Sequence, residues 1–184
     1  VIETKKNALL EANSTFKIAI SKSCFNFCIT ENINEIVKNF PQINFEFVER
    51  IREPEIVKGL QNNQANLAVL KTSTDFYSKE IENKLIKKLH YKMAYNPQFF
   101  NLKDKMTIEE LNKFIILIKR RDGRRDSSWM QYSFASTMTC GDDSTVLSLI
   151  KEGVGIGLLP QEIANKFHLK TVEVIDFPKV ERNL

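Results

Sequence analysis

The chain has 184 residues, of which 42% are hydrophobic and 27% are charged, and its formal net charge is +4. This length can bury a core in one moderate domain or two small ones, and so slight a basic excess excludes a dedicated nucleic-acid binder. The sequence holds no apolar stretch long enough to span a bilayer, and its polar start, VIETKKNALLEANS, has no signal-peptide pattern.

In chain order, the first half alternates predicted strands with predicted helices. Apolar and polar residues alternate over residues 16–20, and apolar residues recur at helical spacing over residues 33–40. INFEFVE (43–49) alternates again, Pro54 opens a second helix, and NLAVL (66–70) is a short apolar strand. This β-α-β-α-β order predicts a parallel sheet, because each returning helix must cross one face of it.

The middle of the chain contains one ambiguous stretch and one clear helix start. Residues 80–95 fit both a helix and a strand, and their aromatic content favours a strand that ends at Pro97. Thr107 and Glu110 have the spacing of a capping box, and FIILI (114–118) follows as a buried strand.

Beyond this strand the pattern continues to the end of the chain. RRDGRR (120–125) predicts a charged loop that turns at Gly123, and Asp126 caps a short predicted helix. Two more strands are predicted, at STMTC (136–140) and TVEVIDF (171–177).

The segment GVGIGLLP (153–160) is rich in glycine but does not have the spacing of a nucleotide-binding loop. A dinucleotide fingerprint needs G-x-G-x-x-G between a strand and a helix, whereas this G-x-G-x-G follows a predicted helix that Asp143 caps. We expect Gly153 to end that helix in the left-handed conformation, and residues 156–159 to form a buried strand. Pro160 suits the first turn of the next helix.

Taken together, these motifs resemble the effector-binding domain of LysR-type transcriptional regulators, a member of the type 2 periplasmic-binding-protein fold. The likeness runs from Phe16 to about Phe177 and is strongest at VLSLIKEGVGIGLLP. FPQINFEF, LQNNQANLAVL and TIEELNKFIILI are similar to further segments of the family in the same order. The chain has Asn63 where the family usually has glycine and Asn66 where aspartate is common, and asparagine tolerates the left-handed backbone of such a turn.

The resemblance implies an α/β fold of two Rossmann-like lobes with mixed, mainly parallel sheets and a ligand cleft between them. We expect residues 15–90 with 168–184 to form lobe I and residues 91–167 to form lobe II. Residues 1–14 are expected to be the remnant of a linker helix.

Ligands of open parallel sheets bind beyond the carboxyl ends of the strands, and the family's cleft lies at the same loops. The residues expected there are Ser21, Lys22, Ser23, Cys24, Lys71, Thr72, Asn96, Pro97, Arg120, Arg121, Gly141 and Asp142. Hydroxyl groups with cationic side chains suit a carboxylate, phosphate or sulfate, so a small anionic metabolite is the expected ligand.

By this resemblance the chain is a regulatory domain that acts as a homodimer or homotetramer and reaches DNA through an N-terminal winged helix-turn-helix outside this sequence. One alternative is a solute-binding protein of a transporter, which would need a signal peptide or lipid anchor. Another is an enzyme on the same fold, but the sequence has no G-x-S-x-G, H-E-x-x-H or phosphate-loop motif, so no catalysis is expected.

The cysteines favour a reducing compartment. Cys24, Cys28 and Cys140 are an odd number without a disulfide framework, which predicts a cytoplasmic protein with no membrane partner. They complete no set of zinc ligands in the sequence, so neither a metal nor another cofactor is expected.

Overall fold

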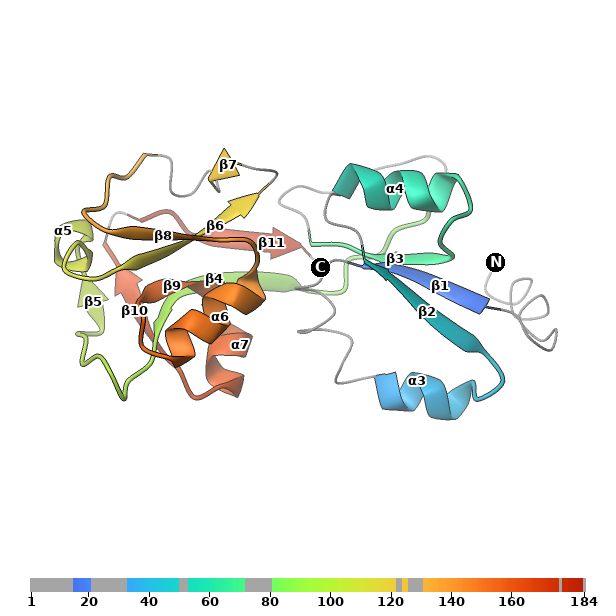
Figure 1. Ribbon diagram of the computed structural model, residues 1–184, viewed down its shortest axis with the longest axis horizontal. Coiled ribbons are helices and arrows are strands. Elements are labelled where there is room, and N and C mark those ends of the chain that lie inside the picture. The colour runs from blue at the N-terminus through green and yellow to red at the C-terminus, as the bar shows by residue number, and fades with distance from the viewer. Residues whose placement is uncertain are drawn as a thin grey trace. The chain divides into compact units, whose positions relative to one another are not determined.

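The structure is a computed structural model that describes residues 15–20, 33–49, 53–71, 81–121, 124–125, 131–175 and 177–183. It divides into two compact units, residues 1–86 with 183–184 and residues 87–182, which are drawn in Figure 1. These bounds differ from the expected ones, because residues 87–90 and 168–182 belong to the second unit instead of the first. The reason is strand pairing: the strands at 170–174 and 180–183 both pair with the strand at 88–95.

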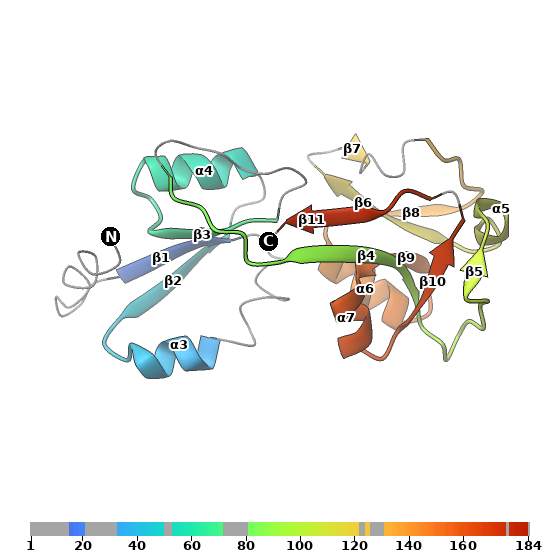
Figure 2. The ribbon, with the colours of Figure 1, turned by 180° about the vertical axis from the view of Figure 1, so that it is seen from behind.

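The first unit contains a three-stranded sheet of order β2-β1-β3, in which both pairs of neighbouring strands are parallel. Figures 1 and 2 show α3 on one side of this sheet and α4 on the other. The predicted β-α-β-α-β order is therefore confirmed. Its elements are β1 (Thr15–Ile20), α3 (Ile33–Asn39), β2 (Asn44–Glu49), α4 (Glu53–Gln61) and β3 (Leu67–Val69).

An asparagine ties the turn before β3 to β1. The Lys17 N–H donates to Asn66 Oδ1 at 2.8 Å, and the Asn66 N–H donates to the Lys17 carbonyl at 2.8 Å. Asn63 has a φ of 55°, so the left-handed conformation expected for this turn is confirmed. The turn therefore sets where β3 starts, beside a small core of Ala19, Ile56 and Ala65.

The second unit is built around an eight-stranded mixed sheet with the main order β5-β10-β4-β9-β6-β7, while β11 pairs with β4 and β8 with β6. The strand interpretation of residues 80–95 is confirmed by β4, and the helix alternative is wrong. The elements are β4 (Lys88–Tyr95), β5 (Lys105–Met106), α5 (Ile108–Leu111), β6 (Ile116–Arg121), β7 (Arg124–Arg125), β8 (Thr137–Cys140), α6 (Asp143–Lys151), β9 (Ile156–Pro160), α7 (Gln161–Lys166), β10 (Lys170–Val174) and β11 (Val180–Asn183).

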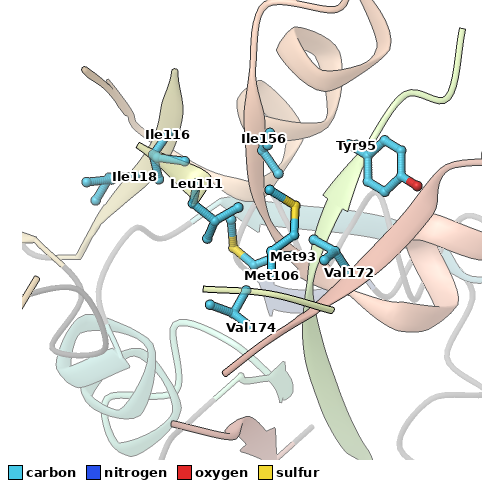
Figure 3. Close-up of a cluster of buried hydrophobic side chains, with 9 residues drawn as sticks. All are labelled: Met93, Tyr95, Met106, Leu111, Ile116, Ile118, Ile156, Val172 and Val174. Carbon is cyan, nitrogen blue, oxygen red and sulfur yellow. The ribbon is translucent and has the colours of Figure 1, made fainter. Parts of the chain in front are cut away.

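The main core of this unit lies between its central strands and α5 (Figure 3). Leu111, Ile116, Ile118 and Ile156 are fully buried there, and the two methionines Met93 and Met106 lie among them. Leu111 is delivered by α5, whose capping box is confirmed: the Glu110 N–H donates to Thr107 Oγ1, and the Thr107 N–H donates to the Glu110 carboxylate.

The glycine segment has a steric role. Gly153 follows α6 with a φ of 70°, as expected for a helix end. A Cβ on Gly155 would lie 2.3 Å from the Ile115 carbonyl oxygen, and one on Gly157 would lie 2.8 Å from Val146 Cγ1. Gly155 therefore lets the start of β9 approach the residue before β6 closely, and Gly157 lets α6 pack closely against β9.

Three expectations about element ends were wrong. Asp142 caps α6, and Asp143 is its first helical residue. Pro160 ends β9 and stands at the N-cap of α7 instead of within its first turn. The arginines expected in a charged loop belong to strands, because β6 continues to Arg121 and pairs with β7. The short helix predicted after Asp126 lies outside the described residues.

Candidate functional site

Four of the expected binding residues come together at one edge of the second unit. Strands β6 and β8 are parallel, with Lys119 opposite Cys140, so both strands end at this edge. Arg120 and Arg121 follow Lys119 on β6, and β8 is followed by Gly141 and Asp142. In open sheets the carboxyl ends of parallel strands are where ligands bind.

A buried ion pair anchors this edge. Lys119 Nζ lies 2.8 Å from Asp143 Oδ1, and only 20% of the lysine side chain and 1% of the aspartate side chain are exposed. The Tyr91 hydroxyl donates to Asp143 Oδ2 at 3.4 Å, and Lys119 Nζ lies 5.6 Å from the centre of the Tyr91 ring. The pair fixes the start of α6 against β6 and β4.

A small cavity adjoins the ion pair. Its volume is about 20 Å³, which is room for about one water molecule or a small ion. The cavity is lined by the ion pair, by Tyr91 and by apolar side chains. Arg182 on β11 adds a second cationic side chain to this lining. The lining residues are Tyr91, Leu117, Lys119, Asp143, Leu158, Val180 and Arg182. A whole metabolite does not fit inside this cavity.

Four residues of this arrangement were not predicted from the sequence. They are Lys119 and its ion-pair partner Asp143, together with Tyr91 and Arg182. The available signal was Lys119 itself, because a lysine that directly follows the buried run Ile116–Ile118 needs a partner. The partner is 24 residues away, and no local pattern connects the two positions.

Asp142 has a structural partner at this edge. Its Oδ1 accepts from the Thr145 N–H at 2.8 Å and from the Thr145 hydroxyl at 3.1 Å. Gly141 is exposed, and a Cβ there would meet no atom within 4 Å. Because Asp142 and Asp143 place two carboxylates at the first turn of α6, the helix dipole there is already compensated.

Asn96 and Pro97 lie at the opposite edge of the same sheet. Strand β4 is antiparallel to β9, and β9 is parallel to β6, so β4 ends where β6 begins. Asn96 is buried, and its amide donates to the Lys151 carbonyl at 2.7 Å while its Oδ1 accepts from the Gln98 N–H. The structure therefore does not bring these two residues together with Arg120 and Gly141.

In the first unit, one of the expected residues is described. Lys71 is half-buried two residues after the end of β3, and β3 is parallel to β1, so both strands end at one edge. The other expected residues of this unit lie outside the described residues; they are Ser21, Lys22, Ser23, Cys24 and Thr72. The assignment of these residues and of the inter-lobe cleft stays a prediction.

Cys140 is the cysteine that the structure describes. It is free and 2% exposed, and burial raises the pKa of its thiol, with a smaller contribution from the charge of Asp142. Over the described ranges there is no group of three His, Cys, Asp or Glu side chains that could hold a metal ion. Nor does any helix in that part of the chain have the length and apolarity needed to cross a membrane.

The fold is that of effector-binding domains of bacterial transcriptional regulators. The OxyR2 E204G regulatory domain from Vibrio vulnificus superposes with a TM-score of 0.66 at 14% identity, covering 95% of this chain and 87% of that one. CrgA from Neisseria meningitidis, a LysR-type transcriptional regulator, gives 0.73 at 11% identity, covering 99% and 64%. The regulatory domain of CcmR from Synechocystis PCC6803, in complex with 2-PG, gives 0.64 at 18% identity, covering 93% and 85%. At such identities these likenesses show the fold alone.

Residues 11–183 match the family profile of the LysR substrate binding domain. The chain belongs to this family, the effector-sensing domains of LysR-type transcriptional regulators. The resemblance read from the sequence is therefore confirmed, and the family assignment favours a regulator over a transport receptor. No curated protein matched at the sequence level.

Proposed function

We propose that this chain senses a small anionic effector and transmits its binding to a DNA-binding domain. The observation that carries the proposal is the edge where β6 and β8 end, because it gathers Arg120, Arg121 and Gly141 at the carboxyl ends of parallel strands. Guanidinium groups suit carboxylates and phosphates because their planar donors match two oxygens at once.

The local charges set the preference for an anion. Asp142 and Asp143 are both held by partners, Asp142 by Thr145 and Asp143 by Lys119. Arg120 is exposed on the strand beside them. A cationic effector would have to displace these partners, whereas an anion meets the exposed Arg120 side chain directly.

Regulation requires the effector to distinguish two conformations of the protein. A ligand shifts such an equilibrium only by as much as its affinities for the two states differ. This chain spans 64% of the length of CrgA, so DNA binding and assembly as a homodimer or homotetramer are proposals that concern a longer protein. Binding of 2-PG by the CcmR regulatory domain supports a small-molecule effector here.

A thermal-shift screen tests the proposal. Organic acids, phosphate esters and inorganic anions are compared with neutral and cationic analogues at constant ionic strength. A ligand at 100 times its dissociation constant adds about 2.7 kcal/mol to the free energy of unfolding. We expect anions to stabilise the chain. We also expect the affinity for these anions to fall at least tenfold in Arg120→Ala or Arg121→Ala. Stabilisation confined to neutral or cationic compounds would contradict the proposal, and turnover of a hit would favour an enzyme.

A further inference from the structure

Strands β6 and β9 separate beside the small cavity of the second unit. Their parallel register ends with Leu117 opposite Gly157, although both strands continue beyond this pair. Lys119 on β6 and Leu158 on β9 both line the cavity just past this point. The cavity therefore lies where two parallel strands diverge toward their carboxyl ends, which is where open sheets bind ligands.

Strand β11 adds a cation to the same cavity. Val180 and Arg182 line it, whereas Glu181 between them is exposed, and its carboxylate lies 3.1 Å from His90 Nδ1. This follows from strand geometry, because successive side chains of a strand point to opposite faces. Tyr91 reaches the cavity from β4, the strand with which β11 pairs (Figure 2).

The charges of the lining favour an anion. The described residues of the lining include two cations, Lys119 and Arg182, and one carboxylate, Asp143, so together they carry one net positive charge. The Asp143 carboxylate is already held, because Lys119 Nζ lies 2.8 Å from one of its oxygens and the Tyr91 hydroxyl donates to the other at 3.4 Å. A cation in the cavity would face two like charges, whereas an anion would balance the lining.

The size of the cavity restricts the anion to a single atom. Its volume is about 20 Å³, and one water molecule needs about 10–15 Å³ of such space. The carboxylate, phosphate and sulfate groups of metabolites are larger. Leu117, Leu158 and Val180 form apolar walls, and charges attract each other more strongly in such surroundings than in water. Water would also fit, but it has no charge to balance the lining.

We propose that this cavity binds one halide ion, such as chloride or bromide, between the Lys119 ammonium and the Arg182 guanidinium. The ion links β6 to β11 and stabilises the folded chain. The inference does not rest on the proposed effector site. Arg120 follows Lys119 on β6 and points to the other face of the strand, and the cavity is too small for an organic effector.

Thermal unfolding in sodium chloride, sodium bromide and sodium gluconate at constant ionic strength tests the proposal, because gluconate is too large for the cavity. A halide at ten times its dissociation constant should raise the midpoint of unfolding by about 3 °C relative to gluconate, and the rise should saturate. Crystals soaked in sodium bromide should show the anomalous signal of bromide beside Lys119 and Arg182.

Two variants of the lining and one control locate the ion. Arg182→Gln removes a cation from the cavity, and Val180→Ile fills the cavity without changing the charge. Both variants should lose the halide-dependent rise. Lys179→Gln makes the same change in charge as Arg182→Gln at an exposed position just before β11, and it should keep the rise.

Several outcomes would overturn the halide site. One is a rise that persists in Arg182→Gln or in Val180→Ile. Another is a rise that is lost in Arg120→Gln, which would place the ion at the edge where β6 and β8 end. A bromide signal in the cavity without any rise in solution would mark an adventitious ion only. None of these outcomes decides whether an organic anion binds, so the proposed effector site stands or fails by its own screen.

Discussion

The Lys119 ammonium lies 2.8 Å from the Asp143 carboxylate and joins β6 to the first residue of α6. Removing the lysine takes away the cation that lies 2.8 Å from a carboxylate that is only 1% exposed, and the Tyr91 hydroxyl still donates to that carboxylate. Lys119→Ala should therefore lower the free energy of unfolding by about 3 kcal/mol in urea titrations. The exposed pair Lys105–Glu173 provides the control, and Lys105→Ala should cost less than about 1 kcal/mol. Equal losses in the two variants would show that burial of the pair does not matter.

The close approach at Gly155 makes a second prediction. Gly155→Ala would place a Cβ 2.3 Å from the Ile115 carbonyl oxygen, so the backbone must shift. We expect a loss of more than about 2 kcal/mol in the free energy of unfolding. Gly59→Ala, in the middle of α4 with no atom within 4 Å of its new Cβ, should instead stabilise the chain by about 0.5–1 kcal/mol. A harmless Gly155→Ala would refute the steric role of the glycine segment.

Cys140 should be an inert thiol in the folded protein. Burial raises its pKa, so folding favours the protonated form. Its contribution to stability is present below the pKa of the unfolded thiol and is lost as pH rises through the raised pKa of the folded state. The test is the rate of alkylation by iodoacetamide at pH 8 in a Cys24→Ser/Cys28→Ser background. The folded chain should react at least about 10-fold more slowly than the chain unfolded in urea, a factor worth about 1.4 kcal/mol. Equal rates would mean that the thiol is accessible and ionised.

Asp142 gives a test of how charge controls binding at the edge of β6 and β8. Asp142→Asn keeps an N-cap oxygen for Thr145 and removes one negative charge near the arginines. Stability should change by less than about 0.5 kcal/mol, and the affinity for an anionic hit should rise about two- to fivefold. Asp142→Ala, which loses the cap, should cost about 1 kcal/mol of stability. A weaker anion affinity in Asp142→Asn would show that the carboxylate itself contacts the ligand.

Much of the fold could be predicted because its signals are local. The alternation over β1 and β2, the capping box at Thr107, and the left-handed turns at Asn63 and Gly153 depend on residues close together in sequence. Those predictions are confirmed for this reason.

The site was harder to predict because it depends on strand direction and on distant pairs. Asn96 follows a strand just as Arg120 does, but β4 is antiparallel to β9, so the two residues lie at opposite edges. The partner of Lys119 is set by the parallel pairing of β6 and β8, which brings the start of α6 beside it. Neither relationship leaves a local pattern in the sequence.

The central claim is that an anionic effector binds where β6 and β8 end, and amide NMR of the isotope-labelled chain tests it most directly. Titration with an anionic hit from the screen should shift the amide signals of residues 119–121 and 141–145 most strongly, in proportion to occupancy. The proposed binding site would be contradicted if the largest shifts were centred on residues 96–100, at the opposite edge of the same sheet, and residues 119–121 did not change.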